Sequence, residues 1–229
     1  MLLVHGYVCN RGIWRPFAQW LAARGHPVES VNLEPVFGTI DDYVPIVVDA
    51  VRRLRERAGG DRIAIVAHSM GGIVVTEVAG RVPSLITRLV YVTAFRPVDG
   101  ESLLDLVQLP EGATDGVQAN IVVEGEPPVA VFDRSKADEV FYHDVPEPVR
   151  ASARERLDPQ PLALFATPVS LPEPITIPTD YVICTDDGAI PPALQELMAA
   201  REPATVFRLA SSHSPMFSFT AELSDILTR

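Results

Sequence analysis

Cysteine is scarce in this sequence, and no pattern of metal-binding side chains accompanies it. The 229 residues include two cysteines, Cys9 and Cys184, which are too few for a disulfide framework. Neither C-x-x-C nor H-E-x-x-H, which are patterns typical of zinc sites, occurs in the chain. We therefore expect no metal site, and we interpret both cysteines as small apolar fillers.

Long apolar runs and positive charge are also lacking. No run approaches the roughly 18–20 apolar residues that span a bilayer, and the amino-terminal residues show no basic region or cleavage site of a secretory signal. The chain has 19 lysine and arginine residues against 30 aspartate and glutamate residues, a formal net charge of −11. Nucleic acids and anionic membranes bind clustered cations, so we expect neither as a partner. This combination favours a cytoplasmic protein and leaves homodimerisation open.

What the chain does contain is a regular alternation of short apolar runs and helix-spaced stretches. This order is typical of an α/β protein with a mostly parallel sheet and helices on both faces. Each predicted strand is almost continuously apolar, as expected for a strand that is buried on both faces. The predicted strands are residues 1–4, 28–33, 63–67, 86–92, 179–184 and 205–209. The predicted helices are residues 14–24, 40–58, 72–81, 192–200 and 217–227.

One long segment interrupts this alternation. Residues 99–178 are rich in proline, which lacks the amide donor that a central strand needs. We therefore predict a cap inserted after the strand that ends near Val92, with residues 1–98 and 179–229 forming the core. Two short helices are expected in the segment, over residues 135–142 and 148–157. The alternative is a long loop without structure, which is uncommon in a compact domain unless it is functional.

The most informative stretch is residues 63–73, which read I-A-I-V-A-H-S-M-G-G-I. A serine at the apex of a strand–turn–helix is exposed at the carboxyl end of a sheet, and it needs small residues two positions away on each side. Ala67 and Gly71 supply these, so the G-x-S-x-G pattern appears here as A-x-S-x-G. The pattern predicts Ser69 as a nucleophile. The alternative is an ordinary strand followed by a glycine-rich helix start.

A serine hydroxyl needs a base to attack, and the base needs an anionic partner. Among the five histidines, His213 follows the last predicted strand, where α/β sheets place groups that face ligands. The alternative role for His213 is to cap the following helix. The loop after residues 179–184 offers Asp186 and Asp187, and the chain order serine, aspartate, histidine fits an α/β-hydrolase triad. We favour Asp187, while the residues alone leave Asp186 open.

Two backbone amides are expected to bind the oxyanion that this attack creates. The first is the amide of Met70, the residue after the nucleophile. The second candidate is the amide of Tyr7, in the loop L-V-H-G-Y, where Gly6 lets the backbone turn toward the site. Since nucleophile, base and oxyanion donors are all protein groups, no cofactor is implied.

These motifs together carry a resemblance to a known family. With L-V-H-G, A-H-S-M-G-G, T-D-D-G-A-I-P-P-A-L-Q and S-S-H-S-P-M in this order, the chain resembles the α/β-hydrolase superfamily. Within it, the chain looks like the branch of plant methyl esterases, hydroxynitrile lyases and their bacterial esterase relatives. The resemblance covers nearly the whole length and implies an α/β-hydrolase fold with a helical cap at residues 99–178. In that family the second acid of T-[DE]-D completes the triad, which supports Asp187.

Two positions separate the chemistries of this branch. Its hydroxynitrile lyases carry a lysine directly after the catalytic histidine and a threonine beside the oxyanion loop, where this chain has Ser214 and Gly6. Without a cation to stabilise departing cyanide, lyase activity is disfavoured. The resemblance thus implies a serine carboxylic-ester hydrolase, which acts on a small to medium apolar ester through an acyl-enzyme intermediate.

Two alternatives to hydrolysis stay open at this point. One is a lyase, acyl transferase or cyclase that acts on a biosynthetic intermediate, and the other is a ligand-binding receptor without useful catalysis. In the esterase interpretation, cap and entrance side chains contact the substrate. The expected substrate-binding residues are Gly6, Trp14, Phe132, Phe141 and Leu164.

Overall fold

The computed structural model describes residues 1–6, 9–35 and 38–229. Within them, the centre is a six-stranded sheet of order β2-β1-β3-β4-β8-β9, in which every neighbouring pair is parallel. The strands are β1 (Leu2–Val4), β2 (Glu29–Val31), β3 (Ile63–Ser69), β4 (Ile86–Ala94), β8 (Thr179–Cys184) and β9 (Thr205–Leu209). All six predicted strands are confirmed, β8 and β9 with the predicted bounds. Strands β3 and β4 each run two residues further, because Ser69 still pairs with Ala94.

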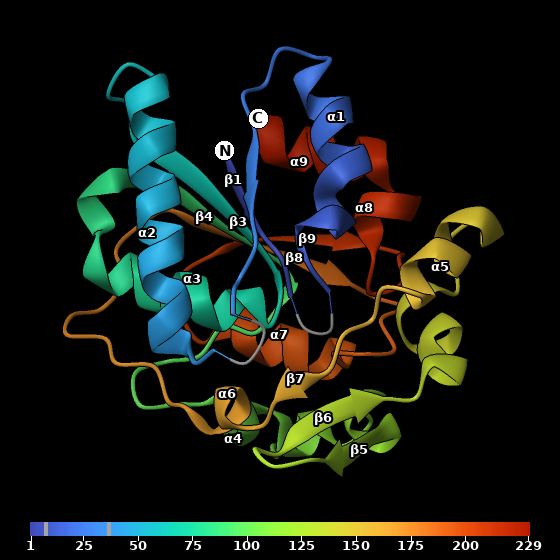
Figure 1. Cartoon of the computed structure of the whole chain (residues 1–229). Helices are drawn as coiled ribbons and strands as arrows, with labels where there is room; N and C mark the ends of the chain where they lie inside the picture. The colour runs from blue at the N-terminus through green and yellow to red at the C-terminus, as the bar shows by residue number, and fades with distance from the viewer. Residues whose placement is uncertain (7–8, 36–37) are drawn as a thin grey trace.

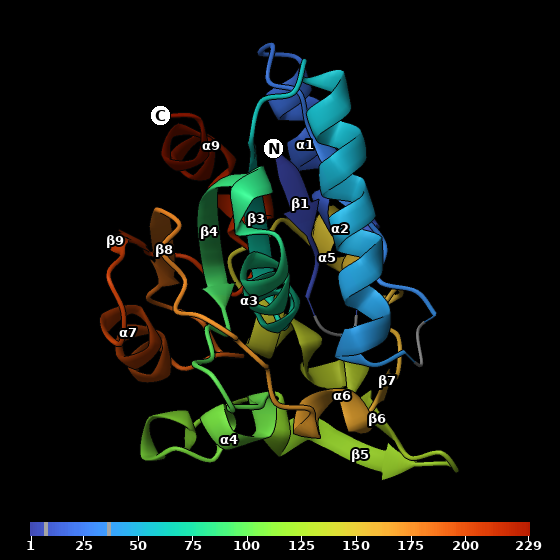
Figure 2. The same cartoon turned by 90° about the vertical axis from the view of Figure 1, so that its left-hand side faces the viewer.

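Helices cover both faces of this sheet (Figures 1 and 2). The first face carries α1 (Arg15–Ala22), α8 (Pro215–Ser218) and α9 (Thr220–Thr228), and the second carries α2 (Ile40–Arg57), α3 (Gly71–Arg81) and α7 (Pro192–Ala200). Successive side chains of a strand point to opposite faces. Leu3 accordingly packs with the helices of the first face, whereas Leu2 and Val4 pack with those of the second. This explains why the strands read as continuous apolar runs, and the predicted α/β architecture is confirmed.

Two helix predictions differ from the structure in detail. The predicted helix over residues 14–24 begins as a 3-10 turn (Arg11–Trp14) before α1. The predicted helix over residues 217–227 is broken at Phe219, whose φ of −120° and ψ of 44° separate α8 from α9. None of the described helices is long and apolar enough to cross a membrane.

Residues 99–178, here called the insertion, connect β4 to β8 and lie beyond the carboxyl ends of the strands, most of them at the bottom of Figure 1. Its helices are α4 (Leu103–Val107), α5 (Glu147–Arg154) and α6 (Ala163–Ala166). The expected helix over residues 135–142 is a 3-10 turn (Arg134–Lys136) followed by a π-helical turn (Asp138–Tyr142). Helix α5 matches the other expected helix except at its ends. The insertion adds no strand to the central sheet.

The insertion also contains strands, which the predicted helical cap did not include. Among the described residues, it holds a separate antiparallel sheet of order β5-β6-β7, formed by Ile121–Glu124, Val129–Phe132 and Gln160–Pro161. Proline is tolerated in this sheet because Pro161 stands on the edge strand β7, where a missing amide donor costs little.

Close packing of α3 on β4 makes one glycine a test of the fold. A Cβ at Gly72 would lie 2.0 Å from the backbone oxygen of Phe95, the residue directly after β4, and a backbone atom cannot shift as a flexible side chain can. Gly72→Ala should therefore lower the free energy of unfolding by about 3 kcal/mol, as measured by urea denaturation.

Gly80→Ala on the same helix is the matched control. There the added Cβ meets the side-chain Cδ2 of Leu171 at 2.9 Å, and this flexible side chain can shift. The gain in helix propensity is roughly 0.5–1 kcal/mol, so stability should stay within about 1 kcal/mol of the wild type. Equal stabilities of the two variants would contradict the close approach of α3 to β4.

Candidate active site

Ser69 is the last residue of β3, at the point where the chain turns into α3. Its φ of 56° lies in the left-handed region, which costs a residue with a Cβ about 1–3 kcal/mol and persists only where the surroundings enforce it. A strained serine between a strand and a helix is the geometry of a nucleophile elbow. The predicted strand–turn–helix around Ser69 is therefore confirmed.

The loop after β1 presses against this serine. A Cβ on Gly6 would lie 2.3 Å from Cβ and 2.9 Å from Oγ of Ser69, so only glycine permits the approach. Met70 is the N-cap of α3, which places its amide at a helix start, where backbone donors lack partners within the helix. Tyr7, the other predicted oxyanion donor, lies outside the described residues.

His5 fixes the position of this loop. Its Nε2 accepts a hydrogen bond from the Leu33 amide at 3.1 Å, and its Nδ1 lies 3.0 Å from the carbonyl oxygen of Gly6. An imidazole that accepts at Nε2 and donates at Nδ1 is neutral. Burial lowers the pKa of His5 to about 4, so this neutral form persists at physiological pH.

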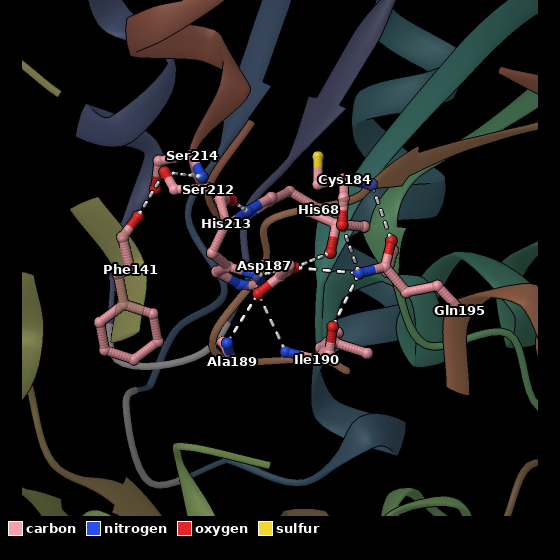
Figure 3. A network of polar contacts seen from close by, with 12 residues as sticks. His68, Phe141, Cys184, Asp187, Ala189, Ile190, Gln195, Ser212, His213 and Ser214 are labelled. Carbon is pink, nitrogen blue, oxygen red and sulfur yellow. Dashed lines mark hydrogen bonds and ion pairs between the residues drawn. The ribbon is translucent and has the colours of Figure 1, made fainter. Parts of the chain in front are cut away.

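Asp187, in the loop after β8, is the acid that contacts His213 (Figure 3). Its Oδ2 accepts from Nδ1 of His213 at 2.8 Å, and its Oδ1 accepts from the amides of Ala189 at 2.7 Å and Ile190 at 3.1 Å. Asp186 is instead exposed. Because Nδ1 of His213 donates to Asp187, the other ring nitrogen of His213 is left to accept a proton.

Two residues that we did not predict hold this carboxylate in place. The hydroxyl of Thr93 donates to Oδ2 of Asp187, and Nε2 of Gln195 donates to the same atom at 3.2 Å. Gln195 also forms hydrogen bonds with Cys184 and Ile190, which connect α7 to the loop that carries Asp187 (Figure 3). Thr93 has a φ of 37°, an uncommon conformation for a β-branched residue. The only sequence signals were the motifs that contain them, V-T-A-F and P-P-A-L-Q.

The loop that carries His213, here called the base loop, is anchored to the nucleophile elbow through His68. Nε2 of His68 donates to the carbonyl oxygen of His213 at 2.7 Å, and the two rings lie 4.6 Å apart. Burial lowers the pKa of His68 well below its usual value, and the neighbouring His213 lowers it further. His68 is therefore neutral and adds no positive charge to oppose protonation of His213.

The insertion also holds the base loop. Asp144 accepts hydrogen bonds from the amide of Ser212 at 2.9 Å and from the hydroxyl of Ser218 at 2.9 Å, and Phe141 places its ring 5.6 Å from that of His213. Within the described residues, no hydrogen bond joins the hydroxyl of Ser69 to His213. Catalytic hydrogen bonds are often long in unliganded enzymes and tighten only when substrate binds.

A cavity of about 380 Å³ opens beside Ser69, between the sheet and the insertion. It is lined by Ser69, Phe95, Leu103, Leu104, Val107, Asp115, Val117, Gln118, Ile121, Leu162, Phe165, Ala166, Ala189 and Ile190. Most of these side chains are apolar, and sites for small organic ligands are usually lined in this way. The arrangement can therefore take an apolar ligand against a serine nucleophile.

None of the five predicted substrate-binding residues lines this cavity, although Gly6 lies against Ser69. Trp14 is fully buried, and its ring packs edge-on against His68 at 6.0 Å, so it lies below the elbow rather than at an entrance. Phe132 packs on Phe141 at 4.8 Å within the core. Leu164 points into the core, while its neighbours on α6, Phe165 and Ala166, face the cavity. The reason is that buried aromatic and aliphatic residues of a cap also build its own core.

Comparison with known proteins adds independent findings. The family model described as "Alpha/beta hydrolase family" matches residues 1–226. The pyrethroid hydrolase of Sphingobium wenxiniae is 27% identical over an alignment of 241 positions, which covers 99% of this chain and 85% of that protein. Methyl jasmonate esterase 1 of Vitis vinifera is 25% identical over an alignment of 244 positions, which covers 97% of this chain and 92% of that protein.

Other relatives are much longer than this chain. The chain spans only 54% and 40% of two chloroplastic proteins of Arabidopsis thaliana that carry provisional methylesterase names. Among solved structures, a pyrethroid hydrolase from Sphingobium faniae superposes with a TM-score of 0.88 at 24% identity, covering 99% of this chain and 94% of that chain. At that level of identity, the superposition demonstrates a shared fold.

Proposed function

Because the chain belongs to the alpha/beta hydrolase family, we propose that it is a serine esterase that hydrolyses a small to medium, largely apolar carboxylic ester. The hydrogen bond between Asp187 and His213 at the sheet edge that carries the strained Ser69 is the main support for this proposal. Relatives named as an esterase and as a pyrethroid hydrolase agree with it. The apolar cavity beside Ser69 suits the substrate.

In the proposed first half-reaction, the hydroxyl oxygen of Ser69 attacks the ester carbonyl carbon while His213 takes the hydroxyl proton. The buried carboxylate of Asp187 keeps Nδ1 of His213 protonated and stabilises the imidazolium. The amide of Met70, with the loop at Gly6, binds the oxyanion, and each such donor contributes roughly 3–4 kcal/mol of transition-state stabilisation. His213 then gives its proton to the leaving alcohol, and the acyl group stays on Ser69.

In the second half-reaction, His213 takes a proton from water, and the resulting nucleophile attacks the acyl-enzyme. The tetrahedral intermediate collapses, Ser69 regains its proton and the carboxylic acid leaves. The insertion acts as a cap in this proposal, because its residues Leu103, Val107 and Leu162 line the cavity next to Ser69. Covering the site with apolar side chains excludes bulk water and strengthens the electrostatic interactions within it.

Covalent labelling tests the proposal directly. A fluorophosphonate should react with the purified protein at a single site, and mass spectrometry of the digested protein should locate the adduct on Ser69. Labelling should be slowed by ester substrates, and p-nitrophenyl esters should be hydrolysed with a dependence on acyl length. An unlabelled Ser69 together with no ester turnover would contradict the proposal. Labelling of Ser69 without turnover of any ester would favour a non-hydrolytic reaction at the same serine.

A further inference from the structure

One buried carboxylate lines the cavity and has no part in the mechanism above. Asp115, in the insertion, is 6% exposed and faces the same cavity as Ser69. Its Oδ1 accepts hydrogen bonds from the amides of Val117 at 2.7 Å and Gln118 at 3.0 Å. Its Oδ2 has no hydrogen-bond partner anywhere in the described residues. Oδ2 is not fully buried, so it is a hydrogen-bond acceptor that stays open to a ligand in the cavity.

The loop of Asp115 is fixed relative to the candidate triad. The amide of Gly116 donates to the carbonyl oxygen of Gly188, the residue after Asp187, at 3.0 Å. The side chain of Asn120 donates to the carbonyl oxygen of Gly116 at 2.8 Å, which holds the turn from its other side. The position of the free Oδ2 is therefore set by the same loop that carries the triad acid.

Asp115 and Asp187 share one local arrangement. In both residues, Oδ1 accepts the amides two and three positions further along the chain, which leaves Oδ2 to face the site. Oδ2 of Asp187 meets three donors, among them His213. The equivalent oxygen of Asp115 faces a cavity whose other lining residues are apolar except for Ser69 and Gln118. Gln118 already donates to the carbonyl oxygen of Val107 at 3.1 Å.

From this geometry, we propose that Asp115 is a specificity-determining residue, which selects esters that carry a hydroxyl or N–H donor on an otherwise apolar body. The donor would bond to Oδ2 in the position where the protein supplies none. An ester that presents only an acceptor there would leave two oxygens facing each other without a proton, so it would bind poorly. This inference rests on the proposed esterase function.

The ionisation of Asp115 gives the selection a pH dependence. Burial raises the pKa of Asp115 to about 6, the charge of Asp187 adds to this, and the amides of Val117 and Gln118 and the nearby His213 oppose it. Above that pH the ionised Oδ2 is a pure acceptor. Below it, the protonated carboxyl can donate, so the preference for donor-bearing esters should weaken as the pH falls.

Asp115→Asn is the most informative substitution, because the two backbone amides dictate how the new side chain lies. Its amide oxygen must take the place of Oδ1 to satisfy Val117 and Gln118, so its NH2 group is turned toward the cavity. The variant thus replaces a free acceptor with a free donor at nearly constant shape. Glu111→Gln, which removes an acid from the same segment outside the cavity lining, is the matched control.

The test compares p-nitrophenyl esters with hydroxyl-ended and methoxy-ended acyl chains over a series of chain lengths. At about pH 8, the wild type should favour the hydroxyl-ended ester by at least about tenfold in kcat/KM at the best length. Asp115→Asn should lower this ratio by about tenfold or more, toward or below unity. Glu111→Gln should leave it unchanged. Since both esters use the same triad, ionisation of His213 cancels in the ratio.

The alternative is that Asp115 only caps the turn that follows it. In that case the ratio would be near unity in the wild type and unmoved by Asp115→Asn or by pH, which would overturn the inference while ester turnover continued. The wild-type ratio should instead fall as the pH is lowered through about 6, and this tests the same claim without any variant. If the wild type turned over neither ester, the proposed function itself would fail.

Discussion

Replacement of Ser69 by alanine is expected to lower kcat for ester hydrolysis by about 10⁶-fold. No other group replaces the attacking oxygen, because the acyl-enzyme forms only on that hydroxyl. Alanine keeps the Cβ that packs against Gly6, so the cavity and the loop after β1 should be retained. Any residual rate would come from direct attack of water on the ester, with the oxyanion donors still stabilising the transition state. Stopped or overnight assays with p-nitrophenyl esters would measure both rates.

The control for this variant is Ser84→Ala, at an exposed serine in the turn before β4. It should hydrolyse esters at the wild-type rate and should still react with a fluorophosphonate, whereas Ser69→Ala should do neither. Thermal unfolding of both variants would exclude a trivial loss of structure. Ester turnover by Ser69→Ala near the wild-type rate would refute the assignment of this serine as nucleophile.

The central sheet could be predicted because burial on both faces leaves a strong trace in the sequence. Strand β8, which is buried along its whole length, has the predicted bounds. Helix α7 and the edge strand β9 also have the predicted bounds, although Thr205 and Arg208 of β9 are exposed. The small sheet of the insertion was missed although β5 (I-V-V-E) and β6 (V-A-V-F) are rich in β-branched residues, because the many prolines of the segment argue against strands. Val122 and Val123 of β5 are 59% and 54% exposed, so these apolar residues do not indicate a buried strand.

The candidate site could also be predicted only in part. Ser69 and His213 stand in motifs whose chemistry depends on adjacent residues, so the sequence was enough to single them out. The residues alone leave Asp186 and Asp187 open, and the family resemblance favours Asp187, which is the carboxylate that bonds to His213 in the structure. Thr93 and Gln195 contact Asp187 from β4 and α7. Thr93 is 94 residues away from Asp187 in the chain, and Gln195 reaches it only through the way in which α7 packs, so no spacing rule identifies either contact.

The substrate-binding residues were the weakest predictions, and Trp14 shows why. An apolar side chain near a motif serves a core as readily as a pocket, and Trp14 supports His68 from beneath the sheet edge. The cavity is instead lined by short stretches of the insertion around Leu103, Asp115 and Leu162. A polar residue such as Asp115 gives no hydrophobic signal, although its position makes it the cavity's principal recognition group in our proposal.

Asp187→Asn is expected to lower kcat by about 10⁴-fold, and the structure indicates the reason. The amides of Ala189 and Ile190 require an acceptor at the Oδ1 position, so the asparagine oxygen must take that place and its NH2 must face His213. A donor there forces Nδ1 of His213 to accept, which moves the ring proton to Nε2. His213 can then no longer take the proton of Ser69.

Asp186→Asn is the matched control, because it changes the same functional group one residue earlier, at an exposed position. Its kcat should stay within about twofold of the wild type, whereas a large loss in Asp186→Asn with a small one in Asp187→Asn would reverse the assignment. Nitrogen chemical shifts of the His213 ring would report the tautomer directly. A tautomer switch in Asp187→Asn, together with a reversed ester preference in Asp115→Asn, would follow from one cause. At both positions, two backbone amides fix Oδ1. Whether the other side-chain atom is an acceptor oxygen or a donor nitrogen then decides which group it can bond to.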